Sequence, residues 1–244
     1  MKIIRSITGM RKVIEKTRQQ GLSIGFVPTM GCLHEGHLSL VRASISDCDT
    51  SVVSIFVNPA QFGPGEDLEK YPRDIEGDAA ALEKEGVDFL FLPEGEDMYP
   101  EGYSTFVEVT SKCVGTLCGA SRPGHFRGVA TVVTKLFNIV DPDKSYFGQK
   151  DVQQVFVIKR MVLDLNLRTV VKVLPTVRES DGLAMSSRNR YLSKDERVQA
   201  GLLFKALCRA KSAVEGGEKN SGAVISAAKE ILSSSQGIRT DYLE

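Results

Sequence analysis

Apolar residues along the first part of the chain fall into a repeating order of short strands and amphipathic helices. Continuous apolar runs predict buried strands at residues 23–27, 50–57 and 88–92. Apolar residues at helical spacing predict helices at residues 8–20, 38–45 and 74–85. Thr8 is the expected N-cap of the first helix, Gly21 its stop, and Pro28 the end of the first strand. Strands that alternate with helices predict an α/β fold with a parallel sheet and helices on both faces, whose ligands bind beyond the carboxyl ends of the strands.

The same texture continues to Leu174 and changes after Pro175. Before that point the pattern predicts two more helices and two more strands, at residues 129–140, 152–165, 145–147 and 168–174. Beyond it we expect a charged helical stretch over 194–215, a second helix over 223–232 and a short strand-like tail. The chain is therefore expected to form two domains, an α/β domain at residues 1–175 and a smaller α+β domain at residues 176–244.

Composition places the chain among soluble globular proteins, because 42% of its residues are hydrophobic and 25% are charged. The longest apolar run, residues 129–140, contains Lys135 and falls short of the roughly 20 residues that span a bilayer. The N-terminal residues Met1 to Arg5 show no apolar secretion signal. We therefore expect a cytoplasmic protein with no membrane partner. Its 5 cysteines are irregularly spaced, which predicts reduced thiols rather than a zinc site.

The net charge of zero conceals a separation of charge along the chain. Residues 61–110 hold 3 basic and 14 acidic residues, whereas residues 1–60, 111–140 and 141–190 carry net charges of +3, +4 and +3. The balanced total argues against a general nucleic-acid binder, which usually has a basic excess. If the basic segments converge in the fold, they could hold a small anion such as a nucleotide; otherwise the clusters are ordinary surface charge.

Two of the 3 histidines lie in one loop, between the first predicted strand of the sheet and the helix after it. His34 and His37 are three residues apart on the first helical turn, so their rings share a face. Gly36 leaves room for a phosphate to approach the backbone, and a helix N-terminus attracts anions. The loop therefore predicts an anion site beside two proton donors. The alternatives are a structural histidine pair and a zinc site, and the spacing differs from the HExxH pattern of zinc enzymes.

This loop, PTMGCLHEGH, resembles the HIGH signature of a superfamily that includes class I aminoacyl-tRNA synthetases and small nucleotidyltransferases. Further segments resemble the pantothenate synthetase (pantoate–β-alanine ligase) family in family order, at residues 56–63, 71–74, 124–129, 146–154 and 185–189. The resemblance covers about residues 24 to 192, and the ordered set is far more specific than a HIGH-like tetrapeptide. Family members usually continue for some tens of residues beyond the position of Glu244, so we expect either a truncated chain, with an incomplete second domain, or a naturally short variant.

The resemblance implies a Rossmann-like fold and an acyl-adenylate reaction. The carboxylate of pantoate attacks the α-phosphorus of ATP, pyrophosphate leaves, and the amine of β-alanine then displaces AMP. Magnesium is expected mainly on the phosphates of ATP, with no metal site made by protein side chains alone. The implied partners are these small molecules and a second copy in a homodimer. Nucleic acid is not among them.

The residues that the resemblance assigns to ATP lie in three segments. They are Met30, Gly31, Cys32, Leu33, His34, Glu35, Gly36, His37, then Gly148, Gln149, Lys150, Asp151, and finally Val177, Met185, Ser186, Ser187 and Arg188. Four of them are the expected catalytic residues, namely His34, His37 as the acid, Lys150 and Arg188. Cationic and N–H donors suit this role, because charge moves to the leaving oxygens during phosphoryl-type transfer. Without the resemblance, Lys150 could be a surface lysine and 186–188 an ordinary turn.

The residues assigned to pantoate are neutral, namely Pro28, Thr29, Asn58, Gln61 and Gln154, with Gln61 also near β-alanine. An Arg clamp would stabilise the carboxylate, whereas amides can hold it and leave its charge free to attack. By residue type alone, Gln61 and Gln154 would be surface amides.

Two charged segments allow two interpretations each. Acidic residues over 67–78 could bind magnesium or the amine of β-alanine, or form a solvated helix face. Arg122, His125 and Arg127 form a basic loop that either covers the site or is structural. Two functional alternatives also stand, a nucleotidyltransferase that stops at the adenylylated product and a non-catalytic nucleotide sensor.

Overall fold

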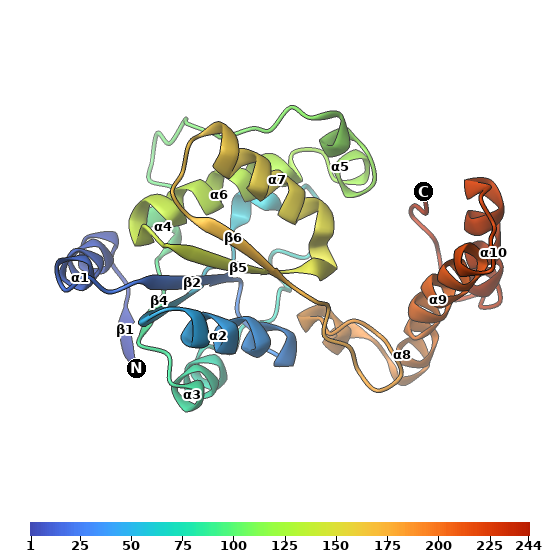
Figure 1. The fold of residues 1–244 in the computed structure, drawn as a ribbon, viewed down its shortest axis with the longest axis horizontal. Coiled ribbons are helices and arrows are strands. Elements are labelled where there is room, and N and C mark those ends of the chain that lie inside the picture. Colours follow the sequence, from blue (N-terminus) through green and yellow to red (C-terminus); the bar gives the residue numbers. More distant parts are fainter. The chain divides into compact units, whose positions relative to one another are not determined.

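The computed structural model describes residues 1–244, which form two compact units, Met1–Pro175 and Thr176–Glu244 (Figure 1). Each unit has its own core, and the two are described separately. No helix in either unit combines the length and apolarity needed to cross a bilayer.

The first unit is built on one sheet of six parallel strands (Figure 1). In spatial order these are β1 (Lys2–Ile4), β4 (Phe89–Phe91), β3 (Thr50–Ile55), β2 (Ile24–Thr29), β5 (Lys144–Gly148) and β6 (Val170–Leu174). The chain winds outward from β2 in one direction through β3 and in the other through β5. The crevice between the carboxyl ends of β2 and β5 is thus the topological switch point, where open α/β sheets bind ligands.

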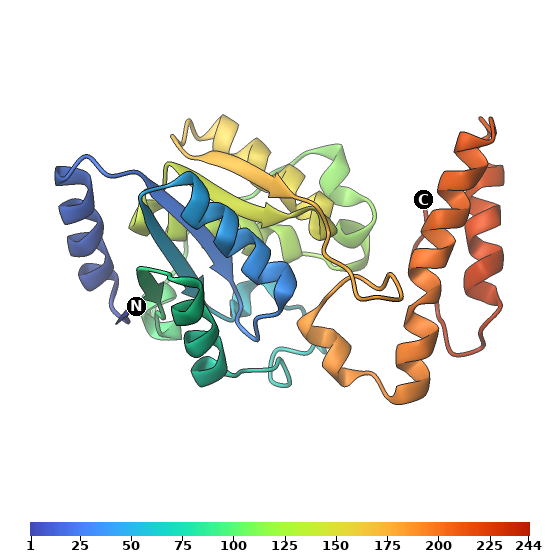
Figure 2. The same cartoon turned by 60° about the horizontal axis from the view of Figure 1, so that its bottom comes forward.

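Helices cover both faces of this sheet (Figure 2), so the predicted fold class is confirmed. On one face α1 (Ile7–Gln19), α6 (His125–Val140) and α7 (Val152–Asp164) bury a core with Phe26. On the other, α2 (Glu35–Asp47) and α3 (Ile75–Glu85) pack over Val27. Successive residues of a strand point to opposite faces, which is why neighbours in β2 belong to different cores.

Two predicted boundaries were wrong. Ser6, not Thr8, is the N-cap of α1, since its side chain accepts a hydrogen bond from Gly9 N. Pro28 lies inside β2 rather than at its end. Even-numbered positions of β2 face β5, as the bond from Asp143 N to Ile24 O shows, but the pairing with β5 stops at Phe26. The missing N–H of proline therefore costs no sheet hydrogen bond.

The sequence pattern did not predict the shortest helices and strands. Strand β1 has only 3 residues and pairs with β4, and helices α4 (Gly95–Met98) and α5 (Cys118–Ser121) have 4 residues each. Elements of this length complete no apolar repeat, so periodicity cannot detect them.

The second unit is helical, with α8 (Lys194–Ala200), α9 (Leu202–Glu215) and α10 (Ser221–Ser233). The helical stretch expected over 194–215 is interrupted at Gly201. The strand expected in the tail is not formed, and the one β contact here is an isolated bridge between Arg178 and Ala184. The core of this unit lies between α9 and α10, so a tail strand would have no strand to pair with.

Candidate active site

Three segments converge at the carboxyl end of the sheet because each follows a parallel strand there. They are the loop after β2, the 3-10 helix η1 (Pro59–Gln61) after β3, and the 3-10 helix η3 (Gln149–Asp151) after β5. The amide of Gln61 reaches Met30, with Nε2 3.4 Å from Sδ. Because β5 pairs with β2, η3 with Lys150 follows the strand next to the one that precedes α2, and the charge of Lys150 contributes to the lowered pKa of His37. The structure thus brings together residues expected to bind ATP and pantoate.

The loop after β2 is anchored from below by a buried carboxylate. Asp78, 4% exposed, accepts hydrogen bonds from Cys32 N at 2.7 Å and Leu33 N at 2.6 Å. The loop needs this support, because Gly31 (φ +83°) and Cys32 (φ +52°) both have left-handed backbone conformations. The interpretation of the acidic segment as a solvated helix face was wrong for Asp78, which points inward and holds the loop.

The two histidines form the N-terminus of α2. His34 is the N-cap, and its Nδ1 accepts from Gly36 N at 3.1 Å, while Nδ1 of His37 accepts from His34 N at 3.3 Å. The ring centroids are 4.1 Å apart. A neutral imidazole whose Nδ1 accepts must carry its proton on Nε2. Each ring in its neutral form therefore carries its N–H on Nε2.

The surroundings keep His37 neutral. Desolvation, followed by the charges of His34 and Lys150, lowers the pKa of His37 from 6.5 to about 3. At neutral pH His37 is thus a hydrogen-bond donor through Nε2 rather than a protonated acid, which changes the role expected for it. The nearby cation is Lys150, whose Nζ lies 3.0 Å from Asp151 Oδ2.

Gln61 is held on both its side chain and its backbone. Its Oε1 accepts from Asn58 Nδ2 at 3.0 Å, and its carbonyl oxygen lies 2.9 Å from Nδ1 of His125. A carbonyl can only accept, so His125 donates through Nδ1, leaving Nε2 as the acceptor for Arg122 Nη1 at 3.2 Å. Arg122 in turn pairs with both oxygens of Glu66.

The basic segment with Arg122, His125 and Arg127 was expected either to cover the site or to be structural, and the contacts of Gln61 favour a structural role for His125 and Arg122. His125 and Arg127 lie in the first turn of α6 rather than in a loop, and His125 and Arg122 buttress η1. Helix α6 approaches so closely that a Cβ on Gly128 would lie 2.1 Å from Ala60 O. A cavity of about 210 Å³ remains between η1 and the start of α6, lined in part by Gln61, His125 and Arg127.

The other residues predicted for pantoate have different situations. Asn58 is buried, and its amide is used inside the protein. Thr29 is also internal, donating to Ser54 O at 2.8 Å and accepting from Gly31 N. Gln154 is half-buried on α7, whereas its neighbour Gln153 is structural, bonding to the backbone of 113–118.

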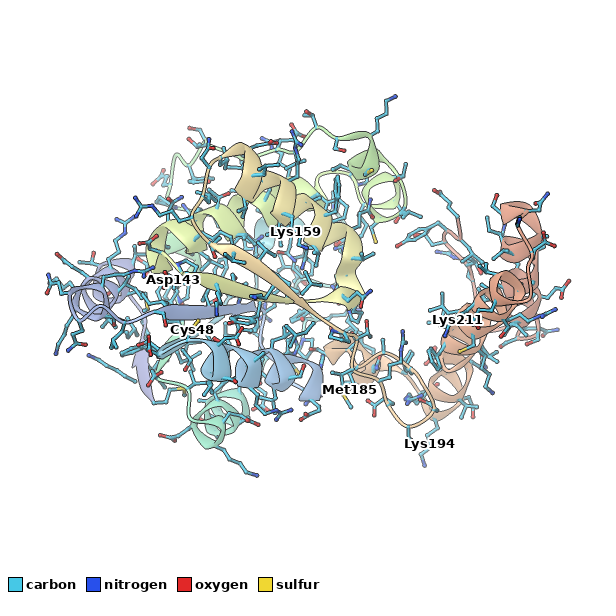
Figure 3. All side chains as sticks on the ribbon, in the orientation of Figure 1. Cys48, Asp143, Lys159, Met185, Lys194 and Lys211 are labelled. Atoms are coloured by element: carbon cyan, nitrogen blue, oxygen red, sulfur yellow. The ribbon has the colours of Figure 1, made fainter.

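The remaining predicted ATP residues belong to the second unit. Met185 (labelled in Figure 3) bonds through its N–H to Val177 O at 3.0 Å, so these two apolar residues are neighbours. Ser186 caps the 3-10 helix η4 (Ser187–Tyr191) by accepting from Arg188 N. This turn gathers two hydroxyls and a guanidinium within the unit.

Sequence reasoning missed the supporting residues. The charge pattern places Asp78 in an acidic segment and does not indicate its role in holding the loop, although its position four residues before the buried Leu82 puts it on the inner face of α3. Tyr99, which donates to Asn58 Oδ1 at 2.7 Å, gives no local signal because its partner is 41 residues away in sequence. No group of three or more His, Cys, Asp or Glu side chains is arranged to hold a metal ion.

Comparison with known proteins shows similarity over nearly the whole chain. The pantoate–β-alanine ligase family model matches residues 2–244. Pantothenate synthetase from Caldicellulosiruptor bescii is 54% identical over 244 residues, which are 100% of this chain and 86% of that protein. The crystal structure of pantothenate synthetase from Thermus thermophilus is 46% identical with a TM-score of 0.94, covering 99% of this chain and 86% of that one. The pantoate–β-alanine ligase from Francisella tularensis, crystallised with beta-gamma ATP and β-alanine, is 37% identical with a TM-score of 0.85, covering 95% and 86%.

Proposed function

The chain belongs to the pantoate–β-alanine ligase family, and from this premise we propose that it condenses pantoate with β-alanine, using ATP and releasing AMP and pyrophosphate. One observation carries the proposal. The histidine-capped N-terminus of α2, Lys150 and the Gln61 amide all lie at the carboxyl end of the sheet. This chemistry needs hydrogen-bond donors to the phosphates and a neutral side chain that binds the carboxylate of pantoate.

ATP binds against the N-terminus of α2. The Nε2–H groups of His34 and His37 donate to the phosphates, and Lys150 adds a point charge. When the carboxylate oxygen of pantoate attacks the α-phosphorus, negative charge grows on the departing pyrophosphate. Donors already fixed in place by the capping bonds stabilise that charge without reorganising. A bound phosphate also opposes the low pKa of His37, because an adjacent anion favours the protonated ring.

Pantoate binds at Gln61 and Gln154. Gln61 is fixed by Asn58 and by His125, so its amide is oriented before the substrate arrives. A neutral amide holds the carboxylate and leaves its oxygen nucleophilic, which a bidentate arginine would not. In the second step the amine of β-alanine attacks the acyl carbon of the pantoyl adenylate, and AMP leaves with the former carboxylate oxygen.

Magnesium is proposed to arrive on ATP. The inward carboxylate of Asp78 is engaged by two backbone N–H groups, and Asp74 caps α3 through Gly77 N, so these acidic groups already have structural partners. The residues present thus fit a metal carried by phosphate oxygens, with Asp151 beside Lys150 the acidic group of the ATP segment. The ion would supply charge neutralisation on the phosphates.

For residues within the second unit, the roles proposed here rest on resemblance to the family alone. Ser186, Ser187 and Arg188 bind phosphate, and Val177 and Met185 form apolar walls for adenine. A homodimer and a cytoplasmic location complete the proposal, by resemblance to the family.

The test is to incubate the protein with ATP, magnesium and pantoate, with and without β-alanine, and to measure pyrophosphate and AMP. Release of AMP that requires β-alanine supports the ligase. Pyrophosphate formation with no β-alanine-dependent AMP indicates a transferase that stops at the adenylylated product. Formation of neither product indicates a nucleotide sensor.

A further inference from the structure

A short chain of hydrogen bonds connects Tyr99 to the side-chain amide of Gln61, which is proposed to bind pantoate. The Tyr99 hydroxyl donates to Asn58 Oδ1 at 2.7 Å, and Asn58 Nδ2 donates to Gln61 Oε1 at 3.0 Å. Tyr99 directly follows α4, and nothing in the reaction described above uses it.

Backbone groups fix the direction of this chain. Ala60 N can only donate, and it lies 3.3 Å from Asn58 Oδ1; Gly128 O can only accept, and it lies 3.2 Å from Asn58 Nδ2. The Asn58 amide therefore has one allowed orientation. The Gln61 atom that faces Nδ2 must be the oxygen, so the Gln61 NH2 group points the other way, toward Met30.

This orientation decides which group Gln61 offers to a ligand. With its oxygen held by Asn58, Gln61 presents N–H donors, which suit a carboxylate or hydroxyl. The reversed amide would present a carbonyl oxygen and repel a carboxylate. We propose that Tyr99 is a positioning residue whose hydroxyl, together with the backbone contacts of Ala60 and Gly128, holds the Asn58 amide in place and thereby keeps the Gln61 NH2 group turned toward pantoate. This inference rests on the proposed function for the identity of the ligand.

The surroundings of Tyr99 suit the role of a fixed donor. Burial, with a smaller contribution from Tyr103, raises the pKa of Tyr99 well above its usual value, so the hydroxyl stays protonated. The ring packs against Phe56 and edge-on against Tyr103, with centroids 6.3 and 5.0 Å away. Removing only the hydroxyl therefore leaves the ring in place.

The kinetic test compares Tyr99→Phe with Tyr103→Phe, which removes the hydroxyl of the adjacent ring outside the chain of bonds. Tyr99→Phe is expected to raise KM for pantoate about fivefold, the effect of losing one hydrogen bond, and to leave KM for ATP unchanged. Tyr103→Phe is expected to change neither. Equal pantoate KM values in the wild type and Tyr99→Phe would overturn the proposal.

A second arm asks whether the effect passes through Gln61. In a Gln61→Ala background, adding Tyr99→Phe is expected to cause no further rise in KM for pantoate, because the group it positions is gone. A full, additive fivefold rise would show that Tyr99 acts by general stabilisation and would overturn the proposal.

A third arm separates this inference from the proposed function. In the ligand-free protein, Tyr99→Phe is expected to shift and broaden the NMR signals of the Asn58 and Gln61 side-chain amides, and Tyr103→Phe is expected to leave them unchanged. Unchanged signals in Tyr99→Phe overturn the positioning role whatever the activity. Shifted signals in a protein that lacks pantoate-dependent turnover would contradict the proposed function and leave the positioning of Gln61 intact.

Discussion

His37 illustrates how the role of a residue depends on its surroundings rather than on its type. A histidine beside phosphates suggests a proton donor, yet desolvation and two neighbouring groups lower its pKa from 6.5 to about 3. Its Nδ1 is also committed to the N–H of His34. What His37 can offer at neutral pH is one fixed N–H on Nε2, and a fixed donor is what a departing pyrophosphate requires.

Removal of that donor is expected to slow adenylation far more than it weakens binding. His37→Ala should lower the rate of pantoate-dependent pyrophosphate release about 100-fold or more, the usual effect of deleting a donor to a developing negative charge. Rapid-quench measurement of the first turnover gives this rate, and titration with ATP gives the affinity. An unchanged first-turnover rate would remove His37 from the reaction.

The same low pKa predicts how stability changes with pH. The unfolded chain binds a proton at His37 below pH 6.5 and the folded chain only below about pH 3, so the free energy of unfolding falls as pH decreases between these values. Between pH 7.5 and pH 5 the loss from this group is about 1–2 kcal/mol. His37→Gln keeps an acceptor for His34 N–H and does not titrate. Urea unfolding at both pH values should show a smaller loss in this variant, and an equal loss would contradict the assigned pKa.

At the scale of elements, α3 supports a loop that belongs to another part of the sequence. The loop after β2 bends through two left-handed residues, Gly31 and Cys32, and the carboxylate of Asp78 on α3 binds the N–H groups that this bend exposes. A buried N–H without a partner costs about 1–3 kcal/mol, so the loop conformation depends on this contact.

Asp78→Asn tests the dependence. An amide offers one acceptor oxygen and sets an NH2 group against the second N–H, so the loop should loosen and KM for ATP should rise about tenfold or more. Glu76→Gln neutralises an exposed residue of the same helix and is the matched control. Steady-state kinetics with varied ATP measures both variants. Equal KM values for the two variants would show that the loop holds its shape without the carboxylate.

The parts of this arrangement that depend on residues close together in the sequence could be predicted from it. Apolar runs revealed five of the six strands. Because the strands were expected to be parallel, the loop after β2 and the segment after β5 were expected at the same end of the sheet. The partners of those loops could not be predicted, because Asp78 and Tyr99 act across 46 and 41 residues of sequence. The protonation state of His37 could not be predicted either, because its burial and its proximity to Lys150 exist only in the folded chain.

Across the whole molecule, the net charge of zero is the sum of one strongly acidic segment and several basic ones. The segment 61–110 is strongly acidic, yet the carboxylate of Asp78 is buried under the loop after β2 and accepts hydrogen bonds from two backbone N–H groups. The histidines and Lys150 come from two basic segments that the switch point between β2 and β5 brings together. The sheet thus sets cationic and N–H donors at the site while the surface as a whole stays balanced.

In the proposed reaction, pantoate is activated by attack of its carboxylate on the α-phosphorus of ATP. Pantoate labelled with 18O in its carboxylate, incubated with the protein, ATP, magnesium and β-alanine, tests it most directly by mass spectrometry of the products. The expected products are AMP that carries one 18O atom and unlabelled pyrophosphate. Unlabelled AMP, or 18O found in phosphate or pyrophosphate, would contradict it.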